Sequence, residues 1–138
     1  MMLLKRLRTE ERGAAVIELA LSLPILVTLI YGIFEVSQLY EANAGMQHAL
    51  GEGARVATLC IPNTTQASGC DNPSDTTITA RENAKLFRPW GGSFNVATPT
   101  SSAGYKTLTI TYTRTMNFLF FTGPTITLTR SKQVYIVT

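Results

Sequence analysis

One uninterrupted apolar stretch near the N-terminus constrains this chain more than any other feature of its sequence. It runs from Ala14 to Phe34, is 21 residues long and contains a single charged residue, Glu18. As an α-helix it would extend about 31 Å, which is enough to cross the hydrocarbon core of a bilayer. A carboxylate at the centre of such a helix costs about 2.5–3.5 kcal/mol. We therefore expect a transmembrane helix in which Glu18 has a function.

Charges flank this stretch asymmetrically. The residues before it carry four basic and two acidic side chains, namely Lys5, Arg6, Arg8 and Arg12 against Glu10 and Glu11. Two acidic residues, Glu35 and Glu41, follow it. Because basic flanks stay in the cytoplasm, we expect a cytoplasmic N-terminus and an extracytoplasmic C-terminal region. The basic excess lies mainly in this leader, so the rest of the chain has no basic patch for nucleic acid.

Two other kinds of N-terminal segment fit parts of the pattern. A secretory signal peptide would be cut at a small-x-small site, and Ala42-Asn43-Ala44 supplies one. The apolar core of a signal peptide, however, is usually about 7–15 residues long, and this site lies far beyond the apolar stretch. An uncleaved single-pass anchor agrees with both length and charge. Glu18 favours a third class, because acids inside membrane helices are rare and usually functional.

Residues 11–40 of the chain read ERGAAVIELALSLPILVTLIYGIFEVSQLY. This segment contains Arg12-Gly13, Ala14-Ala15, Glu18 as the fifth residue after Gly13, and Leu23-Pro24. With these elements it resembles the N-terminus of TadE-like proteins, which are pilin-like minor subunits of the tight-adherence (Flp) pilus. The rest of the chain resembles the family only in its general layout.

Neighbouring families fit less well. Conventional type IV pilins and type II secretion pseudopilins usually begin their mature chain with Phe, whereas Ala14 stands here. The major Flp pilin usually has Tyr after the glutamate and almost no globular domain. Leu19 and the long C-terminal region of this chain depart from that pattern.

The resemblance implies cleavage by a prepilin peptidase after Gly13, at the cytoplasmic surface of the bacterial inner membrane. Gly13 has no side chain that would hinder a protease, and the cut would leave a largely protonated amine on Ala14. In the family this amine is commonly methylated. Glu18 could pair with the Ala14 amine of a neighbouring subunit, since pairing relieves the burial of both charges. The alternative is a glutamate that snorkels to water at the membrane edge.

The resemblance also implies the partners of the chain and its location. Besides the peptidase, the expected partners are other pilin or pseudopilin subunits and the inner-membrane pilus assembly platform. The C-terminal domain would be periplasmic or extracellular, with incorporation into the pilus as a further step.

Pro24 interrupts the helical hydrogen bonding of the apolar stretch. It lacks a backbone N–H and clashes with the carbonyl four residues earlier, so we expect a kink near Ala20. Local melting there could let subunits slide from bilayer to filament packing, as type IV pilins are thought to do. An ordinary kink, which membrane helices tolerate, is the equal alternative.

Beyond Phe34 the sequence predicts an amphipathic continuation of the helix to about Leu59. Apolar residues recur at three- and four-residue steps on one face, namely Val36, Leu39, Tyr40, Met46, Leu50, Ala54 and Ala57. Asn43 and Gln47 border this face, and His48 lies on the opposite, solvated one. We expect the apolar face to pack against a small sheet.

The only two cysteines, Cys60 and Cys70, flank a polar loop. In an extracytoplasmic domain this predicts a disulfide, which would add about 2–3 kcal/mol by constraining the unfolded chain. Free thiols or a metal pair are the alternatives. A metal is disfavoured because the only histidine, His48, lies well before the loop.

The predicted organisation has three parts, namely a leader removed on maturation (residues 1–13), a transmembrane and assembly helix (14–34), and an extracytoplasmic pilin-like domain (35–138). The last part is predicted to be α+β, with the long helix packed on an antiparallel sheet of about three strands. Asp75 or Thr76 would cap a short helix that ends near Phe87.

The C-terminal region predicts strands because its apolar residues alternate with threonines. Phe94 and Val96 indicate a short first strand. Tyr105–Thr115 and Thr125–Val137 follow the two-residue period of half-buried antiparallel strands. Together these segments predict a three-stranded meander with one face on the helix.

A cluster of large apolar residues, Phe118-Leu119-Phe120-Phe121, connects the last two strands. We expect these side chains to plug the end of the sheet. The alternative is an exposed partner patch, with Phe118, Phe120 and Phe121 docking on another subunit or dipping into the membrane. Trp90 is expected in the core.

The sequence offers no basis for catalysis. It lacks a Gly-rich phosphate loop, a metal-ligand cluster and a G-x-S-x-G motif. We therefore expect no enzyme, cofactor, metal or small-molecule substrate. Two functions remain: a structural minor pilin (pseudopilin) that acts in pilus assembly and surface adherence, or an uncleaved membrane-anchored accessory module that never enters the filament.

Overall fold

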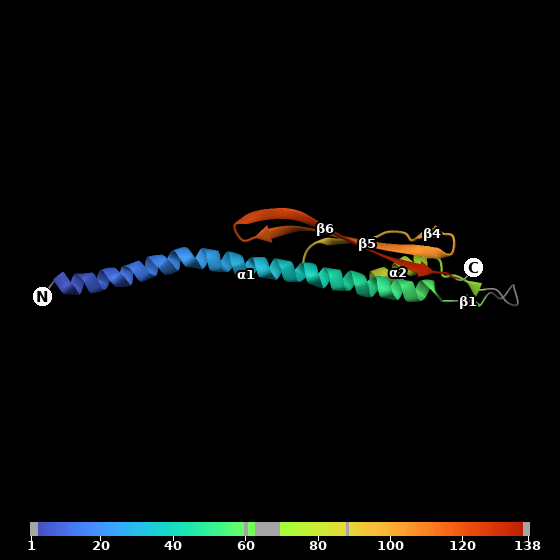
Figure 1. The fold of residues 1–138 in the computed structure, drawn as a ribbon, viewed down its shortest axis with the longest axis horizontal. Helices are drawn as coiled ribbons and strands as arrows, with labels where there is room; N and C mark the ends of the chain where they lie inside the picture. The colour runs from blue at the N-terminus through green and yellow to red at the C-terminus, as the bar shows by residue number, and fades with distance from the viewer. Residues whose placement is uncertain (1–2, 60, 63–69, 88, 137–138) are drawn as a thin grey trace.

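The structure is a computed structural model that describes residues 3–59, 61–62, 70–87 and 89–136, with side chains left aside in residues 3–12, 62 and 70. Its described helices are α1 (Leu3–Ala57) and α2 (Asp75–Lys85). Its described strands are β1 (Ile61–Pro62), β2 (Cys70–Asp71), β3 (Ser93–Val96), β4 (Thr100–Ser102), β5 (Tyr105–Phe118) and β6 (Phe121–Tyr135). Figure 1 shows α1 as a long helix, with the sheet lying along its C-terminal half. We call the apolar part of this helix, residues 14–34, the stem. The predicted α+β fold is confirmed.

The first half of α1 projects beyond the rest of the molecule. Side chains 13–26 are all exposed, and the helix is long and apolar enough to cross a membrane by length and composition. Pro24 lies inside the helix without ending it. Near it, the Ser22 hydroxyl donates to the carbonyl of Leu19 (3.1 Å) and the Thr28 hydroxyl donates to that of Pro24 (2.7 Å). Figure 1 shows a gentle bend in the blue part of the helix; the predicted kink near Ala20 and its role in assembly stay predictions.

The second half of α1 packs on the sheet through the predicted face. Met46, Leu50, Ala54 and Ala57 are buried, as expected. The prediction is wrong for Val36 and Tyr40, whose residues are 45% and 72% exposed. Both line open grooves between α1 and the sheet, so their side chains stay largely uncovered although the sheet reaches the helix at this level.

Strand β5 is the centre of the main sheet, which has four strands in the described part of the chain. β6 pairs antiparallel with β5 from Tyr105↔Tyr135 to Phe118↔Phe121, with a register shift between Thr115 and Asn117. β3 and β4 both pair antiparallel with β5 as well. A strand has only two edges, so β3 and β4 share the edge that β6 leaves open. The three predicted strands are present as β3, β5 and β6, and β4 is a fourth strand that the sequence analysis did not predict.

Alternation of side chains explains the sheet's orientation. Leu108, Ile110 and Tyr112 point to the core and are completely buried, while the intervening threonines are half-buried. The two-residue period of an antiparallel strand produces this pattern directly.

We call residues 35–136, which contain the sheet, α2 and the second half of α1, the head. Two details predicted for this part of the chain are wrong. The cap of α2 is Ser74, whose side chain accepts a hydrogen bond from the backbone N–H of Thr77 (3.3 Å), and the helix ends at Lys85. The residue after it, Leu86, is buried, whereas Phe87 is exposed. Ser74 precedes both predicted caps, and serine is as good a cap as aspartate.

Cys60, one half of the predicted disulfide, lies outside the described residues. The strands beside it pair antiparallel, with Ile61 opposite Asp71. The two chain segments that flank the polar loop therefore lie side by side, and the disulfide stays a prediction.

Candidate functional site

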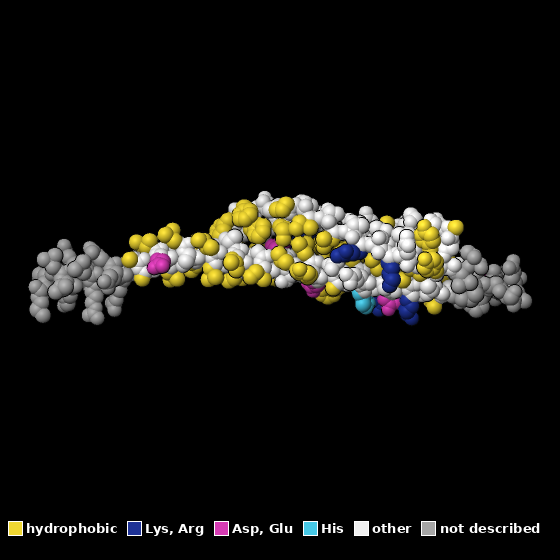
Figure 2. Space-filling view, in the orientation of Figure 1, with side chains coloured by type: hydrophobic (Ala, Val, Ile, Leu, Met, Phe, Trp, Pro, Cys, Tyr) yellow, Lys and Arg dark blue, Asp and Glu magenta, His cyan; other side chains and the backbone are white. Residues whose placement is uncertain are grey.

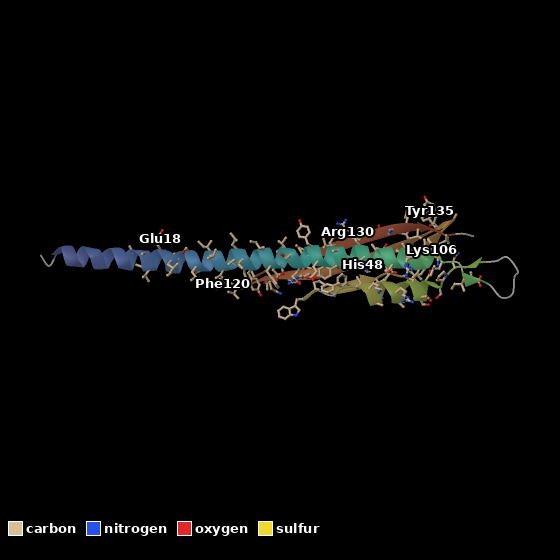
Figure 3. The ribbon with its side chains drawn as sticks, turned by 90° about the horizontal axis from the view of Figure 1, so that it is seen from below. Glu18, His48, Lys106, Phe120, Arg130 and Tyr135 are labelled. Carbon is tan, nitrogen blue, oxygen red and sulfur yellow. The ribbon has the colours of Figure 1, made fainter. Side chains whose placement is uncertain are left out.

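The predicted processing and assembly residues lie together near the start of the exposed stem. Gly13, Ala14 and Glu18 are all helical and exposed. A methyl group placed on Gly13 would meet no atom within 4 Å. Among the described residues, no hydrogen bond or ion pair involves the Glu18 carboxylate. Figure 3 shows Glu18 projecting from the stem, far from the sheet.

The spacing of these residues determines what they can do chemically. Ala14 and Glu18 are one helical turn apart, or about 6 Å along the axis. A cut after Gly13 would place a cation on Ala14 next to this unpartnered anion. A helix with both charges at one end can pair with a second copy of itself in a single register, because any other register leaves charges buried alone.

A buried ion pair joins α1 to the sheet where the apolar stretch ends. Arg114 on β5 donates to the Glu35 carboxylate through Nε (3.0 Å) and Nη2 (2.8 Å), and both side chains are buried. Arg114 Nη1 also donates to the backbone carbonyl of Trp90. Glu35 was expected only as an acidic flank. Instead it connects the stem to the head.

The sequence contained a signal for this pair. Arg114 continues the series Leu108, Ile110, Tyr112, in which every second residue faces the core. A charged residue in that series must find a partner, since burying an unpaired charge is costly. The partner could not be deduced, because Glu35 is 79 residues away in the chain.

Trp90 is not in the core, contrary to expectation. Its residue is 83% exposed, although its backbone is held by Arg114 and by a hydrogen bond from its N–H to the Gln38 side chain (3.0 Å). Gly91 and Gly92 follow with positive φ, and a methyl group on Gly92 would overlap the Tyr112 ring and hydroxyl. This close approach lets the Tyr112 hydroxyl donate to the carbonyl of Gly91 (2.9 Å). The turn thus fixes the backbone and leaves the indole outside.

A buried carboxylate on α2 was missed by the sequence analysis. Glu82 is completely buried, and neither carboxylate oxygen has a hydrogen-bond partner within the described part of the chain. Burial raises its pKa from 4.5 to about 7. A methyl group on Gly53 of α1 would lie 2.5 Å from Glu82 Oε1, so this glycine makes room for the carboxylate. The signal was a glycine on the buried face of a helix, which permits close approach of another element.

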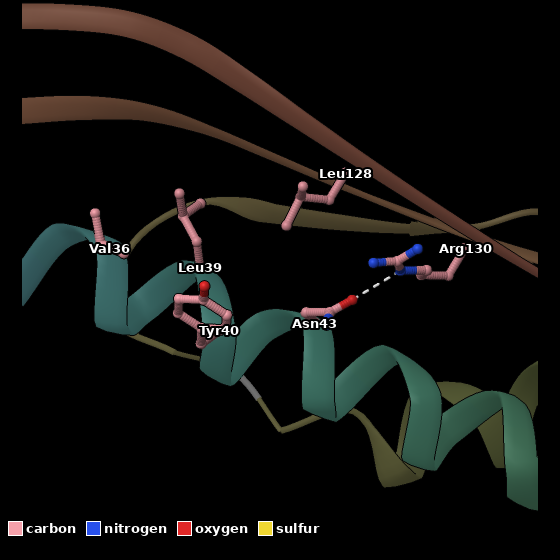
Figure 4. Close-up of a pocket in the computed structure, with 6 residues that line it drawn as sticks. All are labelled: Val36, Leu39, Tyr40, Asn43, Leu128 and Arg130. Atoms are coloured by element: carbon pink, nitrogen blue, oxygen red, sulfur yellow. Dashed lines mark hydrogen bonds between the residues drawn. The ribbon is translucent and has the colours of Figure 1, made fainter.

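A groove lies between α1 and β6, and it is lined by Asn43, a polar residue that was predicted to border the sheet-facing side of α1. Its volume is about 270 Å³, and its lining is Val36, Leu39, Tyr40, Asn43, Leu128 and Arg130. Figure 4 shows Arg130 at one end, where Nε donates to Asn43 Oδ1 (2.8 Å). The groove is open and mainly apolar, and two of its polar side chains, Asn43 and Arg130, are hydrogen-bonded to each other.

The connection between β5 and β6 does not plug the sheet. Leu119, Phe120 and Phe121 are 57%, 65% and 55% exposed, while Phe118 is half-buried and stacks on Phe121 with ring centroids 4.8 Å apart. The plug interpretation is therefore wrong, and the side chains form an exposed patch. We call Phe118–Phe121 the hairpin tip. In Figure 2, apolar side chains cover this end of the sheet and the neighbouring stem, while charged side chains lie mostly over the other half.

Within the described residues, no group of His, Cys, Asp and Glu side chains could hold a metal ion. His48 is exposed, as predicted, and Figure 3 shows it on the helix away from Glu18.

Comparison with protein families matches residues 13–55 to the TadE-like protein family. The match begins at the predicted cleavage site and covers the exposed stem and most of the amphipathic half of α1. It confirms the resemblance seen in the sequence. Comparisons with curated proteins and with solved structures found no match.

Proposed function

We propose that this chain, TadE-like over residues 13–55, is a structural minor pilin (pseudopilin) of a tight-adherence pilus. In this proposal a prepilin peptidase removes residues 1–13, and the new N-terminus joins Glu18 in assembly. The TadE-like family is a structural family associated with tight-adherence pili, which supports a role with that machinery.

One observation carries the proposal: Glu18 is the single charge in the apolar stretch of residues 14–34, and its side chain is exposed. Nothing in its own chain compensates this carboxylate within the described residues. Once buried in a bilayer or a filament, the carboxylate needs a cation as its partner. The Ala14 amine of a neighbouring subunit is a cation at the matching position, and it exists only after cleavage.

The location follows from the same stem. An apolar helix that can span a membrane, with basic residues before it, orients the head outside the cytoplasm. Domain limits at residues 13 and 34 are part of this proposal. The expected partners are the peptidase, other pilin or pseudopilin subunits and the inner-membrane assembly platform.

A second function is favoured by one specific observation. Gly13 lies in the middle of a continuous helix that starts at Leu3, whereas a peptidase requires an accessible, locally extended chain. If that helix is never opened, the protein stays an uncleaved single-pass accessory module that binds its partners outside the cytoplasm. Glycine weakens a helix by about 1 kcal/mol relative to alanine, which favours opening at this position.

Intact mass of the protein from membranes of its bacterial host distinguishes the two functions. We expect a chain that starts at Ala14 in cells with the prepilin peptidase and a full-length chain in cells without it. An additional methyl mass would identify N-methylation. A full-length chain in both strains would refute the pilin proposal in favour of the permanent anchor. A start at Gly45 in both would show a secreted domain and refute both functions.

A further inference from the structure

The hairpin tip reaches down to the level of the apolar stretch. A methyl group on Gly32 would lie 3.6 Å from Phe118 Cε1, and Gly32 precedes the end of the stretch at Phe34. An apolar groove of about 480 Å³ separates the tip from the stem, and its lining extends from Tyr40 down to Leu29. The head therefore overlaps the last turns of the segment that we propose to lie in the membrane.

The tip has the side chains of a membrane-inserting loop. Leu119, Phe120 and Phe121 are exposed, and no charged residue occurs between Arg114 and Arg130. Exposed apolar side chains occur at the same level on the stem, namely Leu29, Ile30 and Ile33. The apolar surface thus continues from the helix onto the hairpin without a polar border.

The backbone of the tip determines how deep it can insert. Phe118 pairs with Phe121, so the turn itself comprises only Leu119 and Phe120. Strand pairing satisfies the backbone groups that face each other across the hairpin, while no other described strand pairs with the outer edges of β5 and β6 at this level. Because an unsatisfied N–H or C=O in hydrocarbon costs several kcal/mol, the tip suits the shallow interfacial region and not the bilayer centre.

Exposed aromatic residues mark the expected water boundary just above the tip. The backbone N–H of Trp90 donates to the side chain of Gln38, and Tyr40 lies two residues after Gln38 on α1. Trp and Tyr are enriched at membrane interfaces, where a ring and a polar group are both accommodated. The groove lining starts at Leu29, five residues before Phe34, which corresponds to about 7.5 Å of helix. This depth agrees with the typical insertion of interfacial segments, about 5–10 Å.

From this geometry we infer that the hairpin tip inserts among lipid acyl chains in the outer leaflet of the membrane that α1 crosses. The tip is a second membrane contact of the head and fixes its tilt and height above the bilayer. This inference rests on the proposed membrane-anchored state. Lipid is favoured over a second copy of the chain because the tip is level with the apolar stretch, where acyl chains surround the stem from every side.

Tryptophan quenching by brominated lipid tests the inference on the full chain. In a Trp90→Phe background the only tryptophan is then introduced by Phe120→Trp, and the protein is placed in nanodiscs at one copy per disc. We expect blue-shifted emission and quenching that is several-fold stronger with bromines near the glycerol end of the acyl chains than near their methyl end.

Two matched variants make each outcome decisive. Tyr135→Trp places the probe on another exposed aromatic position of β6, at the opposite end of the hairpin (Figure 3), and should show red-shifted emission without quenching. Leu26→Trp probes the exposed stem and should be quenched most by deep bromines. If Leu26→Trp is not quenched, the membrane-anchored state itself fails.

If Leu26→Trp is quenched and Phe120→Trp is not, the anchor stands and the inference about the tip is overturned. Blue-shifted emission at position 120 without lipid quenching would also overturn it, because the tip would then be covered by protein. Quenching of equal strength at positions 120 and 135 would count against a specific role of the tip.

Discussion

The buried carboxylate of Glu82 makes the stability of the head depend on pH in an unusual direction. Its pKa rises to about 7 in the folded chain, from an ordinary value of 4.5, because burial disfavours the charged form. Between these two values the folded state keeps a proton that the unfolded state has lost. Stability from this group is therefore complete below about pH 4.5 and is lost as the pH rises to about 7.

The magnitude follows from the difference between the two pKa values. Each factor of ten in proton affinity corresponds to about 1.36 kcal/mol, so deprotonation of Glu82 should cost about 3 kcal/mol of unfolding free energy. Glu82→Gln keeps the size of the side chain and removes the titration. We expect the unfolding free energy of the variant, relative to that of the wild type, to increase by about 3 kcal/mol when the pH is raised from about 4 to about 8.

Urea unfolding of the full chain in detergent micelles measures this difference. Near-ultraviolet circular dichroism of the buried Tyr112 reports on the head, and linear extrapolation gives the unfolding free energy. The comparison of variant with wild type cancels the contributions of all other titrating groups. An identical pH dependence in the two proteins would refute the reasoning, because it would mean that Glu82 has a partner that keeps it charged.

Three further predictions test the packing of the head and the role of the stem. Gly53→Ala forces a methyl group against the buried carboxylate of Glu82, whereas a methyl group at Gly51 meets no atom within 4 Å. The Gly53→Ala variant should therefore be less stable than the matched Gly51→Ala variant by about 1–3 kcal/mol. Equal urea midpoints of the two variants would contradict this. Arg114→Met leaves a buried carboxylate unpaired and should cost about 3–5 kcal/mol, whereas Arg55→Met breaks only an exposed pair and should change the midpoint little. Similar losses in both would remove the argument from burial. Glu18→Ala should leave the protein in the membrane fraction but reduce piliation and surface adherence of the host, and normal piliation would show that the carboxylate is not an assembly residue.

Periodicity predicted most elements of this fold because each of them has one buried apolar face and one polar face. The three- and four-residue steps of Met46, Leu50 and Ala54 and the two-residue steps of Leu108, Ile110 and Tyr112 each bury one face. Strand β4 lacked such a signal, because Thr100–Ser102 is fully exposed and is held only by pairing with β5. Its existence depends on a neighbouring strand and not on its own residues.

Residues that act between elements were beyond what patterns could predict. Glu82 is buried because Gly53 of another helix approaches it, and no local pattern distinguishes it from an exposed helical glutamate. Trp90 is exposed because two glycines and Arg114 position its backbone. The stem was different. Gly13, Ala14 and Glu18 could be proposed from sequence because their expected chemistry depends only on spacing along one helix.

The ion pair between Glu35 and Arg114 has a consequence for the far end of the helix. It locks the rotation of α1 against the sheet, and Glu18 lies 17 residues earlier on the same helix, about 26 Å away. A shift of one residue at the lock would swing Glu18 by about 100° around the helix axis. The ion pair inside the head thus determines the direction in which Glu18 points from the stem. Pro24 lies between the two, and because it removes one helical hydrogen bond, we expect any change in that angular relation to occur there.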